Sequence, residues 1–267
     1  MLNLPDHVYE DFGNSAGSSV PANVIPLETI KRWIGIIQGQ NIVLFDWALE
    51  KLVSELVKIY PYILLRPSSQ QGIPHRVCNI LLLFQCIAGN PETKEKFLKA
   101  KIAHYIFPLM DIGNMAAHFE CLRLGALGVI DHLLNEPIDG AAVRFAMDTG
   151  VLHYCAKGVE FGCSQSKLHA VSIIESMLRT PKGLQYCCVL ADRFFVIDGL
   201  LKKLLAYIPT MKVDGTCTEM FCLVVSCYAK LSQKSRARDG LRCYCLSCCS
   251  KDLSPVYVLM TQLLMGM

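Results

Sequence analysis

The sequence predicts an all-α fold, an armadillo-like helical repeat solenoid (an α–α superhelix). An apolar helical stretch ends four times at an X-Pro or X-Ser step, at Asn90-Pro91, Glu136-Pro137, Thr180-Pro181 and Lys234-Ser235. Proline is favoured at the first position of a helix, where its missing N–H needs no partner, so each X-Pro step indicates a new helix. The steps recur at intervals of roughly 44 to 54 residues, near the period of armadillo and HEAT arrays. The composition, 52% hydrophobic and 18% charged, agrees with helices buried on more than one side.

Each repeat is predicted to contain one long apolar helix, one short helix and one of intermediate length. Long helices are predicted over 76–89, 118–134, 167–178 and 219–231. Short helices are predicted over 92–100, 138–148, 182–190 and 235–243, and intermediate ones over 102–112, 151–159 and 194–207. In the second long helix, apolar residues recur every three or four positions, as expected of a core-facing helix. Gly125 and Gly128 interrupt that helix and indicate close packing against a neighbour.

The regions outside the repeats are less regular. Residues 1–24 lack periodicity and include a Gly/Ser-rich stretch, which predicts a disordered N-terminal tail. We expect one armadillo-like domain over 25–250, beginning with helices over 25–37 and 41–60, and a diverged C-terminal tail over 251–267. No run approaches the ~20 apolar residues needed to cross a bilayer, and the first residues lack a signal-peptide pattern. Membrane association and secretion are therefore not expected.

The chain contains 14 cysteines. Six lie within the apolar helical stripes, and we expect them to be reduced thiols that act as small buried hydrophobic residues: Cys78, Cys86, Cys121, Cys155, Cys222 and Cys227. Near the C-terminus, Cys245-x-x-Cys248 has the spacing of two zinc ligands, with Cys243 and Cys249 beside it. No second pair of cysteines or histidines follows to complete a separate four-ligand pattern, so a structural use of these thiols is favoured over a metal site.

Motifs for catalysis are missing from the sequence. It contains no nucleophile elbow, zinc-protease motif, P-loop or dinucleotide-binding glycine pattern. Asp148-Thr149-Gly150 spells the aspartic-protease triplet, but that chemistry needs two carboxylates presented from paired loops. Gly150 is better explained as the residue that ends a short helix. We expect no catalytic residue, no cofactor and no metal.

Four segments together resemble the Rcd-one/Caf-forty cell differentiation family: RVCNILLLFQCIAGNPETKEKFLKAKIAHYIFPLM, FECLRLGALGVIDHLL, KGLQYCCVLADRF and CYAKLSQKSRARDGLR. Members of this family are armadillo-type subunits of the CCR-NOT deadenylase complex. The resemblance covers about residues 25–245. It implies a noncatalytic adaptor, cytoplasmic and nuclear, that docks on the Not-one scaffold and receives regulatory proteins with tryptophan-containing or short helical motifs. Such an adaptor links particular mRNAs to deadenylation and translational repression, and family members are also linked to transcription and differentiation control.

The resemblance also implies two binding regions. Long third helices line the concave face of armadillo proteins, and the groove candidates on them are the polar residues near the helix starts: Arg76, Asn79, Arg123 and His169. The family accepts partner tryptophans in pockets between later helices, and local alignment gives these candidates: Arg193, Phe194, Cys227 and Tyr228. Ala191 stands where a larger aromatic residue is expected. If these assignments hold, Leu127→Asp should unfold the chain, whereas Arg123→Glu should spare the fold and weaken a groove-bound partner.

The chain departs from the family pattern in a segment between Trp33 and Tyr60 that is about one helix shorter, and in Ser235, which replaces a proline. One alternative is a transport-receptor-like peptide adaptor, but the positions of its asparagine ladder here are Cys86, His132, Ser176 and Lys230. Another is a nucleic-acid binder, supported by one basic cluster: Lys230, Lys234, Arg236, Arg238 and Arg242. With a net charge of +3, the overall electrostatic attraction to nucleic acid is weak. The sequence leaves open whether the chain forms a homodimer.

Overall fold

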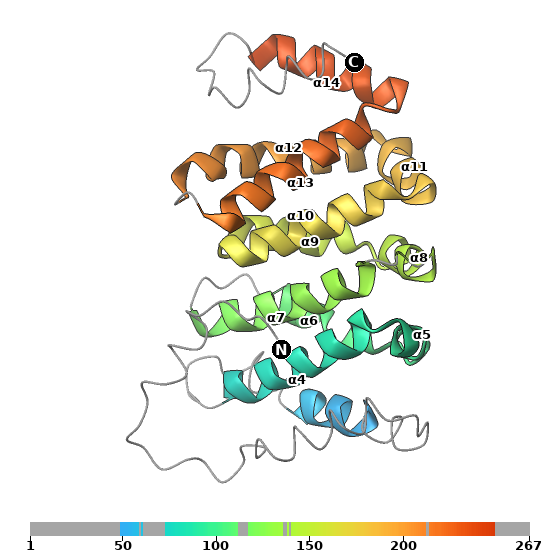
Figure 1. Ribbon diagram of the computed structural model, residues 1–267, viewed down its shortest axis with the longest axis vertical. Coiled ribbons are helices and arrows are strands. Elements are labelled where there is room, and N and C mark those ends of the chain that lie inside the picture. Colours follow the sequence, from blue (N-terminus) through green and yellow to red (C-terminus); the bar gives the residue numbers. More distant parts are fainter. Residues whose placement is uncertain are drawn as a thin grey trace.

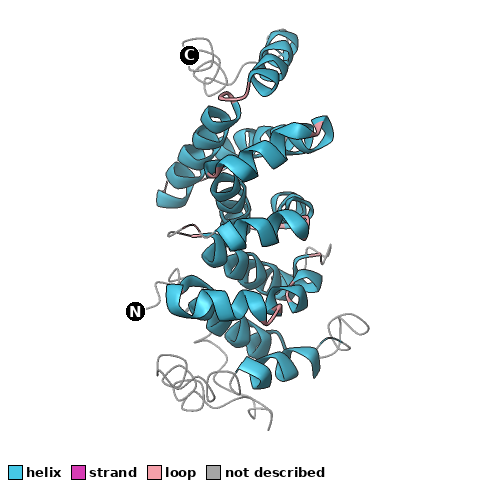
Figure 2. Ribbon diagram, turned by 90° about the vertical axis from the view of Figure 1, so that its right-hand side faces the viewer, coloured by secondary structure: helices cyan, strands magenta, loops and turns pink. Residues whose placement is uncertain are grey.

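The computed structural model describes residues 49–58, 60, 73–111, 117–135, 138, 140–211 and 214–248. Within these residues the chain forms α-helices and two short 3₁₀ helices, and it contains no strand. The helices stack along the long axis of the molecule, as Figures 1 and 2 show from two sides. This arrangement confirms the predicted helical solenoid. The predicted tails, 1–24 and 251–267, and the helix predicted over 25–37 lie outside the described residues.

Three helices make up each repeat. Residues 49–58 are helical and precede the first long helix, α4 (Ile73–Gly89). The next repeat consists of α5 (Pro91–Lys99), the pair η1 (Ile102–Tyr105) and α6 (Phe107–Met110), and α7 (Ala117–Leu134). It is followed by α8 (Gly140–Asp148), α9 (Val151–Phe161) and α10 (Ser164–Arg179). The third contains α11 (Pro181–Val189), α12 (Ala191–Tyr207) with η2 (Ile208–Thr210), and α13 (Gly215–Leu231). Helix α14 (Ser235–Cys248) follows α13.

The predicted X-Pro landmarks are helix starts where the structure describes them. The Asn90 side chain accepts a hydrogen bond from the Glu92 backbone N–H at 3.0 Å, and Pro91 is the first residue of α5. The Thr180 hydroxyl accepts one from the Gly183 N–H at 3.1 Å, immediately before Pro181 of α11. These side chains satisfy N–H groups that lack a partner within the helix. The Glu136-Pro137 step lies outside the described residues, and α14 begins at Ser235.

Two turns illustrate how the backbone sets the helix boundaries. The single helix predicted over 102–112 is wrong, because the segment divides into η1 and α6 at Ile106. Pro108, in the first turn of α6, has no N–H to continue the hydrogen bonds of the preceding turn. Between α8 and α9, Gly150 adopts φ 65° and ψ 41°, the left-handed conformation that glycine tolerates best. That geometry confirms the helix-ending role predicted for Gly150.

The long helices α4, α7, α10 and α13 pack successively against one another. In Figure 1 they lie one above the next, with α5, α8 and α11 along one edge of the stack. Gly125 and Gly128 of α7 permit the close approach of α4. A Cβ atom would lie 2.9 Å from Leu81 Cδ1 at the first glycine and 2.4 Å from Gln85 Nε2 at the second. The tight packing predicted from these glycines is confirmed.

The prediction of six buried, reduced thiols is correct only in part. Cys155 and Cys227 are buried and free, and Cys86 is free but half-buried. Cys78 and Cys121 instead form a disulfide between α4 and α7, because the close helix packing brings their Cα atoms to 6.6 Å. Cys222 is free but exposed, since it lies on the outer side of α13.

The described residues show neither a candidate metal site nor a candidate membrane span. They contain no group of three or more His, Cys, Asp or Glu side chains placed to hold a metal ion. None of their helices combines the length and the apolar character needed to cross a membrane. The side chains of Cys243 to Cys249 lie outside this description, so the interpretation of that cluster stays a prediction.

Candidate docking surface

A row of polar contacts joins the four long helices, with at least one contact at each interface. Gln85 Nε2 on α4 donates to the Gly125 carbonyl of α7 at 3.1 Å. His169 Nδ1 on α10 lies 2.7 Å from Asp131 Oδ2 of α7. The Ser226 hydroxyl on α13 donates to Glu175 Oε1 of α10 at 2.8 Å. Because each contact depends on the relative position of two helices, this polar row fixes the register of the stack.

The carboxylates of the polar row are buried. Asp131 is 7% exposed and Glu175 is 4% exposed. Arg179 donates to Glu175 from Nη2 at 2.6 Å, so this carboxylate has a charged partner as well as Ser226. A buried carboxylate destabilises the fold unless it is hydrogen-bonded or paired with a charge, so these two groups depend on the partners that neighbouring side chains supply. The helices that carry them are therefore held in one arrangement.

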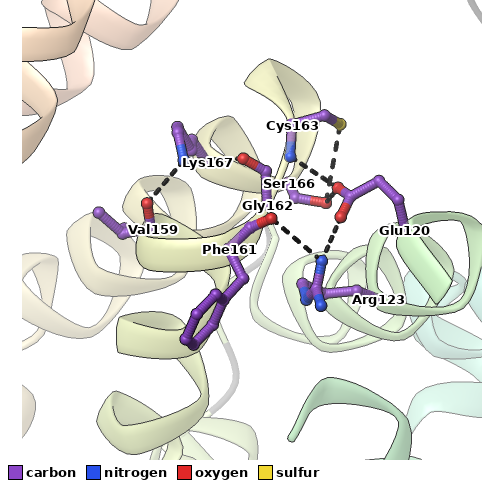
Figure 3. A network of polar contacts seen from close by, with 8 residues as sticks. All are labelled: Glu120, Arg123, Val159, Phe161, Gly162, Cys163, Ser166 and Lys167. Atoms are coloured by element: carbon purple, nitrogen blue, oxygen red, sulfur yellow. Dashed lines mark hydrogen bonds and ion pairs between the residues drawn. The ribbon is translucent and has the colours of Figure 1, made fainter. Parts of the chain in front are cut away.

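A second polar network lies near the amino ends of α7 and α10 (Figure 3). Glu120 Oε1 accepts hydrogen bonds from the Ser166 hydroxyl at 2.6 Å and from the Cys163 N–H at 2.7 Å. Glu120 Oε2 pairs with Arg123 Nη1, which also donates to the Phe161 carbonyl at 3.3 Å. One carboxylate and one guanidinium of α7 thus hold the turn between α9 and α10. We call this group of five residues the Glu120 network.

Lys167 extends the contacts of this region toward α12. Its Nζ donates to the Val159 carbonyl at 2.6 Å and to the Gly162 carbonyl at 2.7 Å. The same ammonium lies 5.1 Å from the ring centroid of Tyr207, within cation–π distance. Burial lowers the pKa of Lys167 by disfavouring the charged form. The carbonyl acceptors show that this lysine serves the fold of the turn.

Of the four groove candidates, two have partly exposed side chains. Asn79 is half-buried on α4, and His169 is half-buried on α10, where it pairs with Asp131. The expectation that Arg123 lines an open groove is wrong, because its side chain is 0% exposed. Glu120 and the Phe161 carbonyl enclose its guanidinium. Arg76 lies in α4, and its side chain is outside the description.

Two of the four tryptophan-pocket candidates lie at the start of α12 and two lie in α13, and three of the four are buried in the core. Phe194, Cys227 and Tyr228 are buried, and the Tyr228 hydroxyl donates to Asp198 Oδ1 at 3.3 Å. Arg193 is half-buried, with its guanidinium carbon 3.7 Å from the Tyr186 ring centroid. Binding of a partner's tryptophan here stays a prediction. In this structure three of the four candidate side chains are covered by other side chains.

Four apolar side chains at the junction of α11 and α12 are exposed, and the sequence reasoning missed them. We call them the α11–α12 patch; their exposed fractions range from 44% to 57%: Val189, Leu190, Phe195 and Val196. The sequence feature that could have indicated them is the run of four apolar residues over 194–197, which is longer than one core-facing side of a helix needs. Phe194 and Ile197 occupy the core-facing side of α12, so the two residues between them point away from it. The exposure of these four side chains within a short stretch of the chain makes them candidates for a binding surface.

Comparison with known proteins decides the family. Residues 42–255 match the model of the Cell differentiation family, Rcd1-like. The chain belongs to this family. It is 33% identical over 214 residues to Cell differentiation protein rcd1 of Schizosaccharomyces pombe, a match that spans 78% of this chain and 73% of the relative. It is also 33% identical over 193 residues to Protein CAF40 of Saccharomyces cerevisiae. That match spans 72% of this chain and 50% of the relative.

The fold has a separate match among solved structures. A designed armadillo repeat protein in complex with peptide (KR)4 superposes with a TM-score of 0.50 and 14% sequence identity. The superposition covers 89% of this chain and 98% of the designed protein. At this identity the likeness concerns the fold alone. The Rcd1-like family and the armadillo-like fold are both of a non-enzymatic repeat type.

Proposed function

We propose that this chain is a noncatalytic adaptor subunit of the CCR-NOT deadenylase complex. In this role it docks on the Not-one scaffold and receives regulatory proteins, and it thereby connects particular mRNAs to deadenylation and translational repression in the cytoplasm and to transcription control in the nucleus. Membership of the Rcd1-like family carries the proposal. The name CAF40, borne by a relative with 33% identity, suggests a complex subunit and supports the same role.

The construction of the stack suits an adaptor. The polar row and the Glu120 network hold the long helices in a fixed arrangement, so the surface can be recognised without being reorganised on binding. A preorganised surface loses less conformational entropy when a partner binds. The α11–α12 patch supplies exposed apolar area for a regulator, and an aromatic anchor would bury the most area there. We propose tryptophan-containing or short helical motifs as its ligands.

Neither alternative gains support of its own. A peptide adaptor of the transport-receptor type needs side-chain amides along successive long helices. At two of the corresponding positions, His132 Nδ1 lies 2.7 Å from the Gly128 carbonyl of its own helix, and Ser176 is buried. Nucleic-acid binding would depend on the local basic cluster, because the net charge is only +3. Binding that collapses between low and moderate salt would favour that alternative.

Purification of the tagged chain from cells, after nuclease treatment, tests the proposal. We expect the Not-one scaffold and deadenylase subunits to copurify. Val196→Asp should deplete regulators that depend on the α11–α12 patch and leave the core subunits bound. The matched control is Val57→Asp, which places the same charge on another exposed valine at the far end of the stack. Recovery of the folded chain without any subunit of the complex would reject the proposal.

A further inference from the structure

The packing of α4 against α7 places two cysteines within reach of each other. The Cα atoms of Cys78 and Cys121 are 6.6 Å apart, inside the range of about 4.4 to 6.8 Å that a disulfide spans. The approach is set by the helices, because Gly125 and Gly128 leave no room for a Cβ against Leu81 and Gln85. The fold therefore brings the two thiols together whether or not they are bonded.

The other cysteines whose side chains the structure describes are free. Cys155, Cys187 and Cys227 are buried, and burial raises the pKa of each thiol, which keeps it in the unreactive protonated form. Cys121 differs because it is half-buried and its partner is adjacent. Adjacency gives the second thiol a very high effective concentration, which favours formation of the bond.

We propose that Cys78 and Cys121 form a thiol–disulfide modification site that reacts reversibly with a small-molecule disulfide of the glutathione class. The Cys121 thiolate attacks one sulfur of glutathione disulfide, which forms a mixed disulfide and releases one glutathione thiolate. The Cys78 thiolate then attacks the Cys121 sulfur and releases the second. The two protons lost by the cysteines end on the two glutathione thiols. The protein is oxidised by two electrons, and glutathione disulfide is reduced by two.

The oxidised pair completes a chain of links along the amino-terminal half of the long helices. Cys78–Cys121 joins α4 to α7, and Glu120 joins α7 to α10 through the Ser166 hydroxyl. Gln165 Nε2 then donates to the Thr216 hydroxyl at 3.1 Å, which joins α10 to α13. The first link is the covalent one. Reduction loosens the stack at the α4–α7 interface and leaves the two polar links in place.

The test equilibrates the purified full chain in buffers with varying ratios of reduced to oxidised glutathione. Thiols are then blocked, and the chain is digested and analysed by mass spectrometry. The proposal expects a peptide linked through Cys78 and Cys121 that appears in oxidising buffer and disappears on reduction. The bond closes a loop with a sequence separation of 43, so oxidation should raise the melting temperature by roughly 5 to 15 °C.

Two variants separate this site from the other thiols. Cys121→Ser should abolish both the linked peptide and the melting shift, whereas Cys163→Ser, at an exposed cysteine of the α9–α10 turn, should keep both. If Cys121→Ser fails to fold, Cys78→Ala provides the same comparison, and the wild-type peptide map is decisive by itself. The absence of the linked peptide at every ratio would overturn the proposal, as would a melting shift that persists in the variant.

Discussion

The α7–α10 interface and the α11–α12 junction show opposite uses of the same helical repeat. At the α7–α10 interface, charged and polar groups are buried and paired: Arg123 and Ser166 are 0% exposed, and Asp131 is 7% exposed. At the α11–α12 junction, apolar groups are exposed instead, with Val189 57% and Val196 45% accessible to solvent. In the first region polar contacts fix the positions of the helices, and in the second region apolar area remains available to a partner.

This difference predicts how each region responds to mutation. Buried charged groups depend on one another, so the loss or reversal of one leaves its neighbours without partners. Exposed apolar side chains contribute little to folding, because their area stays in contact with water. Changes at the α7–α10 interface should therefore act on stability, and changes at the α11–α12 junction should act on binding.

The largest difference should follow from placing the same carboxylate in each region. Leu127 of α7 is 0% exposed, so Leu127→Asp should cost at least several kcal/mol and abolish the cooperative melting transition. Val196→Asp should change stability by less than about 0.5 kcal/mol. Circular dichroism during heating measures both. Similar melting curves for the two variants would mean that the regions do not differ as described.

Reversing the Arg123 charge should also unfold the chain in part. A rim position would have predicted an unchanged melting curve, but Arg123 is buried against Glu120 and the Phe161 carbonyl. Arg123→Glu would bury a second carboxylate beside Glu120, at an expected cost of about 3–5 kcal/mol. Arg144→Glu, at an exposed position of α8, is the charge-matched control and should be nearly neutral. Chemical denaturation measures the free energy of unfolding of both variants. An Arg123→Glu protein as stable as wild type would contradict the burial of this side chain.

Two glycines that lie within helices should respond with opposite sign. A Cβ at Gly125 would lie 2.9 Å from Leu81 Cδ1 and 3.1 Å from Leu81 Cβ, so Gly125→Ala should destabilise by about 1–3 kcal/mol. Gly199 of α12 has nothing within 4 Å of that position, so Gly199→Ala should stabilise by about 0.5–1 kcal/mol through helix propensity. Urea denaturation compares them. Equal effects would show that α7 and α12 are packed alike.

A pH-dependent effect on stability is expected under alkaline conditions. Burial raises the pKa of the Cys187 thiol from 9.0 to about 12. The unfolded chain loses this proton near pH 9 while the folded chain keeps it, so the free energy of unfolding falls as pH rises from 9 to 12, by up to about 1.4 kcal/mol per unit for this group. Cys187→Ala should reduce that slope. Identical slopes in wild type and Cys187→Ala would contradict the assignment.

The repeat architecture could be predicted from the sequence because its signals are local. Pro91 and Pro181 mark helix starts through a missing N–H, and Gly125 marks a close approach through a missing Cβ. The burial of Arg123 could not be predicted, because it depends on a carbonyl of the α9–α10 turn, 38 positions away in the chain. The disulfide between Cys78 and Cys121 could not be predicted for the same reason, because it pairs residues of different repeats.

The candidate site was less predictable than the fold. A polar residue near a helix start can lie in a groove or under a neighbouring turn, and periodicity alone does not separate the two cases. Asn79 and His169 are partly exposed, whereas Arg123 is enclosed. Family alignment selected residues at the start of α12 and in α13, and three of these four residues are buried in the core. Phe195 and Val196 were missed because the helical pattern does not show which apolar side chains stay exposed.

Binding between the purified chain and a purified fragment of the Not-one scaffold tests the adaptor role most directly. Calorimetric titration should give a saturable complex with defined stoichiometry, and it should show little dependence on salt if packed apolar surfaces carry the contact. Val196→Asp, which tests regulator binding, should titrate like wild type if the scaffold uses another surface. A folded, monodisperse chain that gives no binding heat and does not coelute with the scaffold would contradict the account.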